Sequence, residues 1–323
     1  MQLVGTESEP SNGGEVATGY QRNIMFNREG RTYTNHTHFI ETTSDFRTEL
    51  GFQNRYFKPN TSGMHQTSTF NLYPEESAIN RWRVTGRGVY LEDMRGAKIY
   101  SELSPQVDVR YETTGINARW TDYIEMVQPG QFPGVTTMRS YDYNNWQIGF
   151  DNNTFEALRI NANYREGTTL NLVPKIGNPP SVADTRRIDL NVLLRPTQQL
   201  SIANTYFLTE LDSLAGERVF SNEIFRSNWN YQFTKELSLR FIAQYDNTEA
   251  GPATRLEDDE NLNFDILLRY VINPWSAFYF GYNSNQSNFD IIDFEGELEL
   301  ITANELRRDG DQFFVKFSYL FQR

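Results

Sequence analysis

The chain has 323 residues, of which 38% are apolar, 14% aromatic and 22% charged, and its formal net charge is −12. No segment approaches the roughly 18 consecutive apolar residues of a membrane-spanning helix, and the chain has no cysteine, which excludes disulfides, thiolate zinc sites and cysteine nucleophiles. Its acidity argues against nucleic acid as a partner. A low apolar content with many aromatic residues predicts apolar side chains spread over a thin surface rather than packed in a thick core.

The N-terminal residues contain neither the basic nor the apolar region of a signal peptide. This predicts either that a leader and upstream residues are missing or that the chain is not a protein of the cell envelope. Residues 2–5 are too short to span a membrane and are interpreted as the remnant of a longer strand. We interpret residues 1–323 as one domain, N-terminally incomplete.

Apolar and polar residues alternate with a period of two in many segments, so each predicted strand has one apolar and one polar face. Clear examples lie at 188–194, 225–233, 237–246, 262–270 and 313–321. The parity slips between Tyr143 and Trp146, which predicts a β-bulge at Asn144 and Asn145.

Short and long connections alternate between the predicted strands. The short ones lie near 27–31, 74–80, 113–115, 151–155, 196–199, 234–236 and 272–274. The longer, more polar ones cover 7–17, 42–61, 91–97, 126–134, 166–184, 212–218, 247–260 and 288–309. This rhythm predicts an all-β fold, a transmembrane antiparallel up-and-down β-barrel of about 16 strands (14 to 18) in a bacterial outer membrane. A soluble sandwich or β-helix is the alternative.

Five tryptophans are expected to contribute to the aromatic girdles at the two membrane interfaces. They are Trp82, Trp120, Trp146, Trp229 and Trp275.

The polar faces of the strands carry many more basic than acidic side chains. The predicted lumen-facing basic residues are Arg81, Arg83, Arg87, Arg110, Arg119, Arg159, Arg187, Arg195, Arg226, Arg240, Arg269 and Lys316. Either these residues pair with acidic groups and only stiffen the barrel, or they line a passage that favours anions. The acidic segments 257–260 and 290–311 are expected to form a solvated outer surface, with Ca²⁺ binding as the alternative.

The chain has three histidines, His36, His38 and His65. His36 and His38 share a strand face, and His65 lies on the next predicted strand. Three histidines on adjacent strands predict a candidate zinc site with an open position, the alternative being polar residues of the lumen. The same histidines are the only candidate bases for a barrel hydrolase. Without a Gly-x-Ser-x-Gly or a phosphate-binding loop, we expect no enzyme activity and no cofactor.

Several segments resemble the family of bacterial outer-membrane proteins known as the DUF5916 barrel domain. They are residues 44–52 (SDFRTELGF), 227–234 (SNWNYQFT), 237–240 (LSLR), 281–284 (GYNS) and 311–321 (DQFFVKFSYLF). The resemblance covers about 18–323 and implies an outer-membrane barrel of unestablished function, without catalytic residues. In that family the barrel often follows a carbohydrate-binding family 9-like domain, which this chain lacks.

The C-terminal segment carries alternating aromatic residues, Phe317, Tyr319 and Phe321. They are interpreted as a membrane-insertion signal for the barrel-assembly machinery. The other expected partners are outer-membrane lipid and lipopolysaccharide, with a small anionic or sugar solute. The predicted role is a pore or surface component, linked to carbohydrate handling through a separate module. The alternatives are a docking barrel with a plugged lumen and a barrel-embedded hydrolase.

Overall fold

The computed structural model describes residues 1–8, 16–47, 59–294 and 297–320, and its regular structure there is entirely β-strand. One sheet contains sixteen strands. Their bounds are β1 Gln2–Ser8, β2 Ala17–Arg28, β3 Tyr33–Thr42, β4 Thr61–Leu72, β5 Arg81–Asp93, β6 Lys98–Tyr111, β7 Thr114–Val127, β8 Arg139–Phe155, β9 Leu158–Asn171, β10 Ser181–Leu194, β11 Leu200–Ser213, β12 Arg218–Gln232, β13 Leu237–Ala250, β14 Asp259–Asn273, β15 Ser276–Phe294 and β16 Glu297–Tyr319.

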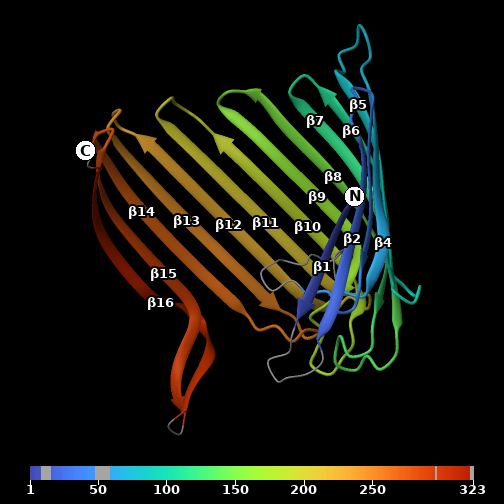
Figure 1. The fold of residues 1–323 in the computed structure, drawn as a ribbon. Helices are drawn as coiled ribbons and strands as arrows, with labels where there is room; N and C mark the ends of the chain where they lie inside the picture. The colour runs from blue at the N-terminus through green and yellow to red at the C-terminus, as the bar shows by residue number, and fades with distance from the viewer. Residues whose placement is uncertain (9–15, 48–58, 295–296, 321–323) are drawn as a thin grey trace.

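Each strand pairs antiparallel with the next strand along the chain, so the sheet order is the chain order (Figure 1). This confirms the predicted up-and-down barrel architecture and its strand number. The connections predicted to be short lie at one end of the sheet, the turn end, and the other connections lie at the opposite end, the loop end. None of the described residues forms a helix long and apolar enough to cross a membrane.

Three of the predicted long loops are shorter than expected. β5 and β11 each end in a tight turn, in which Gly96 and Gly216 adopt a positive φ of 82° and donate backbone hydrogen bonds to Asp93 and Ser213. Glycine takes up this conformation at no steric cost. The segment 288–309 is not a loop within the described residues, because β15 continues to Phe294 and β16 begins at Glu297.

The bulge predicted at Asn144 and Asn145 does not occur in the ladder with β7, whereas the ladder with β9 ends at Asn145 opposite Gly167. The β7–β8 register runs without a shift from Trp146 opposite Trp120 to Tyr143 opposite Tyr123. Tyr143 is buried on the inner face, where its hydroxyl donates to Glu125 at 3.0 Å. The break in the apolar–polar alternation therefore comes from an apolar side chain on the inner face, and not from an extra residue in β8 relative to β7.

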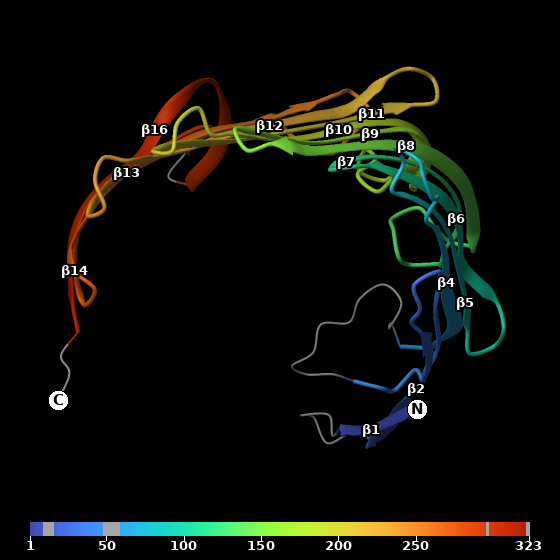
Figure 2. The ribbon, with the colours of Figure 1, turned by 90° about the horizontal axis from the view of Figure 1, so that it is seen from above.

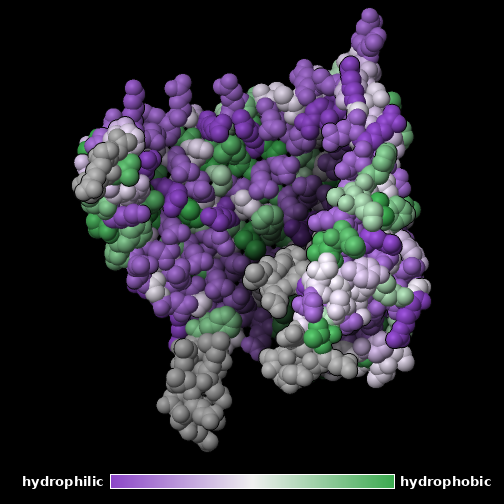
Figure 3. Space-filling model, viewed as in Figure 1, coloured by the Kyte–Doolittle hydropathy of each residue, from purple (hydrophilic) through white to green (hydrophobic). Residues whose placement is uncertain are grey.

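The two faces of the sheet differ in polarity. Large apolar side chains are exposed on the outer face, including Phe70, Ile148 and Ile266, and all five tryptophans are exposed as well. The inner face over β10–β14, seen in Figure 3, is mostly hydrophilic. A polar interior, an apolar exterior and backbone groups satisfied between strands are what a lipid bilayer requires. The chain is thus built as a bacterial outer-membrane β-barrel.

Viewed along its axis, the sheet curves into an arc that is open between its first and last strands (Figure 2). In the described part of the chain no ladder joins β1 to β16. β1 has only 7 residues whereas β16 has 23, so β1 offers a much shorter edge than its counterpart. A strand needs about 9–11 residues to cross the hydrocarbon core.

Candidate functional site

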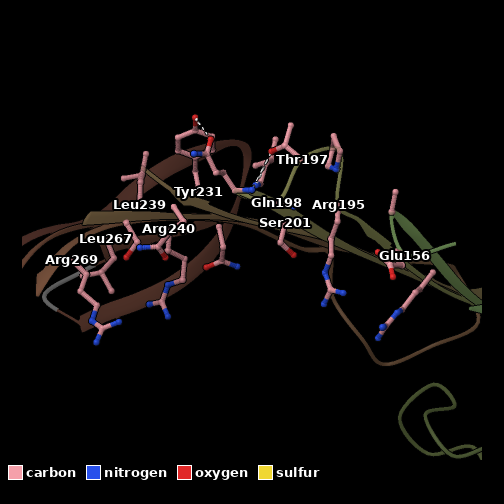
Figure 4. Close-up of a pocket in the computed structure, with 18 residues that line it drawn as sticks. Glu156, Arg195, Thr197, Gln198, Ser201, Tyr231, Leu239, Arg240, Leu267 and Arg269 are labelled. Carbon is pink, nitrogen blue, oxygen red and sulfur yellow. Dashed lines mark hydrogen bonds between the residues drawn. The ribbon is translucent and has the colours of Figure 1, made fainter. Parts of the chain in front are cut away.

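The inner face of the sheet carries the predicted lumen-facing basic residues. In β5, Arg81, Arg83 and Arg87 alternate with the exposed Trp82 and Val84. Residues that lie opposite each other on paired strands point to the same face of the sheet, so the register assigns the inner face on the other strands as well. The residues that share the inner face by register are Arg81, Arg83, Arg87, Arg110, Arg119, Arg159, Arg187, Arg226, Arg240, Arg269 and Lys316. Arg195 directly follows β10 and points to the same side as Arg240 and Arg269 (Figure 4).

Three of these basic residues form ion pairs on the inner face. Arg87 donates to Glu102 at 3.0 Å, and Arg187 donates to Asp189 at 2.9 Å. Arg110 makes two hydrogen bonds, at 2.8 and 3.2 Å, to Asp151 on β8. That pair crosses β7 above Gly115, where a Cβ atom would collide with both side chains.

Removing the Glu102 carboxylate is expected to destabilise the protein. Its side chain is only 10% exposed and accepts hydrogen bonds from Arg87 and the Tyr100 hydroxyl. Glu102→Gln should lower the free energy of unfolding by about 1–3 kcal/mol, because the Arg87 charge loses its acidic partner. Denaturant titration in lipid vesicles measures the change. Glu75→Gln, in the exposed turn before β5, is the control and should have no effect; equal stability of the two variants would contradict this role of Glu102.

A cavity of about 960 Å³ lies at the turn end between β9 and β14. Arg159, Arg195, Arg240 and Arg269 line it together with Glu156. Figure 4 shows the labelled Arg195, Arg240 and Arg269 extending to the same side of the sheet. None of the four arginines lies within 4 Å of a carboxylate of the described residues. We call these four residues the arginine cluster.

The inner face changes character toward the loop end. Val127, Val135, Tyr143 and Leu170 form a buried apolar cluster on which Phe132 packs. Val135 and Phe132 belong to the connection between β7 and β8, so this loop folds onto the inner face. A cavity of about 760 Å³ adjoins the cluster. This apolar region was not predicted from the sequence, although the break in the alternation at Tyr143 was its signal.

The structure brings the three histidines together on β3 and β4. His38 lies opposite His65 in the register, and one nitrogen from each of the three rings lies within 4.8 Å of the others. The Nε2 atoms of His36 and His65 are 3.0 Å apart. Asn27 Oδ1 contacts His36 Nδ1 at 2.5 Å, and Asn23 Oδ1 contacts His38 Nε2 at 3.0 Å. We call these three residues the histidine cluster.

The two described aromatic residues of the predicted insertion signal lie on the outer face of β16. Phe317 and Tyr319 are exposed, and their rings lie 6.4 Å apart. Phe321 lies outside the described residues. Because β16 pairs along its length with β15, the assembly role of these aromatics stays a prediction.

Comparisons with known proteins show similarity at the level of structure only. No family model and no curated protein matches the chain. It aligns with OmpT of Vibrio cholerae, an outer-membrane protein, at 10% identity over 91% of this chain and 99% of that one, with a TM-score of 0.32. The ferric enterobactin receptor PfeA of Pseudomonas aeruginosa aligns at 9% identity and a TM-score of 0.44, over 90% of this chain and 53% of the receptor. The toluene transporter TodX of P. putida aligns at 9% identity and 0.24, over 99% and 87% of the two chains.

Proposed function

We propose that the barrel is a passage for small anions across the outer membrane. The observation that carries the proposal is the arginine cluster, which places four positive charges and one carboxylate, Glu156, around one cavity, with none of the four arginines within 4 Å of a carboxylate of the described residues. In a narrow space with low-dielectric walls, uncompensated charges concentrate ions of the opposite sign. A barrel of about 16 strands is wide enough for a water-filled channel.

The proposed solutes are carboxylates or phosphates, because a guanidinium group can donate two parallel hydrogen bonds to either. The turn end of the barrel then forms an anion-binding mouth. The apolar cluster at the loop end forms a second, less polar section, so that anions with an apolar part suit the whole path. A link to carbohydrate handling and membership of the DUF5916 family stay predictions.

Reversal potentials in planar bilayers test this proposal. Purified protein should insert as discrete conductance steps, and in a KCl gradient the reversal potential should have the sign of chloride permeation. Conductance without anion preference would refute the role of the arginine cluster.

A docking barrel with a plugged lumen is the second candidate. The inward-folded loop that carries Phe132 and Val135 favours it, since this loop already occupies part of the inner face. A complete lack of conductance, together with co-purification of a large envelope partner, would support the docking barrel over the passage.

A further inference from the structure

We propose that His36, His38 and His65 together bind one divalent transition-metal ion of the zinc class. The fold places the three histidines together. The chain has only three histidines, and all three lie in one cluster on neighbouring strands. His36 and His38 are two residues apart on β3, so they share a face, and His65 reaches the same face from β4, where it lies opposite His38.

The distances between the ring nitrogens suit a metal site. Imidazole nitrogens bind Zn²⁺ at about 2.0–2.1 Å, so two nitrogens of a tetrahedral site lie about 3.3 Å apart. The Nε2 atoms of His36 and His65 are 3.0 Å apart, close to this spacing. The third nitrogen lies within 4.8 Å, a gap that rotations of the side chains can close. Three neutral imidazoles leave the fourth position to water.

Hydrogen bonds to two asparagines orient the rings of His36 and His38. The amide oxygens of Asn27 and Asn23 can only accept, so His36 Nδ1 and His38 Nε2 must carry their protons. The lone pairs of these two rings are then on His36 Nε2 and His38 Nδ1. In the absence of metal, His65 Nε2–H donates to His36 Nε2, and a metal ion would take the place of that proton. Outer partners that fix the tautomer in this way are typical of histidine metal sites.

The histidine cluster adjoins a cavity. His36 lines a cavity of about 740 Å³ at the turn end, with Asn27 and Thr67, through which an ion can enter. Arg87 lies opposite Thr67 in the register, but its charge is compensated by Glu102 at 3.0 Å. A bound ion would clamp β3 to β4 near the N-terminal edge of the sheet, where the β1–β2 and β2–β3 ladders are the shortest in the described part of the chain.

Zinc titration of the folded protein tests the site. The protein is purified with a tag that contains no histidine, stripped with a chelator and titrated with ZnCl₂ by calorimetry. We expect one ion per chain, with binding at least tenfold weaker in His36→Ala and in His65→Gln. Asn27→Ala should weaken binding by about 10- to 100-fold. Thr69→Ala, on the same face of β4 but outside the lining of that cavity, is the matched control and should bind like the unmodified protein. Heat-modifiable migration in gels verifies that each variant is folded.

An NMR measurement on the unmodified protein tests the site even if the histidine variants fail to fold. In unmodified protein labelled with ¹⁵N only in histidine, Zn²⁺ should shift the ring signals of all three residues. Unchanged signals, or equal zinc binding by the histidine variants, would overturn the proposal. The histidine cluster is separate from the arginine cluster. Chelator treatment is therefore expected to leave the anion preference unchanged, so that a failure of the zinc site can be distinguished from a failure of the proposed passage.

Discussion

Replacing Arg195, Arg240 and Arg269 together by glutamine is expected to abolish the anion preference of the passage. These residues supply three of the four charges of the arginine cluster, and no carboxylate of the described residues lies within 4 Å of them. The ratio of anion to cation permeability should fall by about tenfold, because focusing by uncompensated charges has effects of that order or more. Reversal potentials in a KCl gradient measure the ratio.

A charge-matched control is available at the loop end. Arg95, Arg139 and Arg255 are exposed residues of connections or strand ends there, and replacing all three by glutamine changes the net charge by the same amount. This control should keep its anion preference, since its charges lie outside the arginine cluster. Equal loss of preference in both triple variants would mean that total charge, rather than the cluster, sets selectivity.

Ile266→Arg is expected to destabilise the barrel strongly, whereas Ile242→Arg is expected to be tolerated. Ile266 is 39% exposed on the outer face of β14, where it lies opposite Phe241. Ile242 follows Phe241 on β13, so its side chain lies on the inner face, opposite Asp265. A lipid-facing arginine near the bilayer midplane costs about 2–4 kcal/mol. An arginine on the inner face stays in water beside an acidic partner.

Reversible denaturant unfolding in lipid vesicles measures both effects. The two variants share the original residue, the substitution and the height in the barrel, so the difference between them reports only the face. Similar stability of the two variants would be incompatible with an outer face that contacts lipid. The reverse order would mean that the inner and outer faces are exchanged.

Much of the fold could be predicted from local pattern. The period-two alternation in segments such as 237–246 and 262–270 assigns inner and outer faces correctly, because successive strand side chains point to opposite sides. The alternation of connection lengths gives the strand number and the up-and-down order. The same local pattern misjudged Tyr143, since an apolar side chain on the inner face breaks the expected polarity without any change of register.

Which side chains meet across strands was decided only by the tertiary structure. The sequence placed His36, His38 and His65 on neighbouring strands, but only the register brings His65 opposite His38. It placed many arginines inside, but only the fold separates Arg110, which reaches Asp151 across β7, from Arg240, which has no carboxylate of the described residues within 4 Å. Alternation is a property of one strand, whereas pairing depends on the stagger between strands and on the curvature of the sheet, which no single segment encodes.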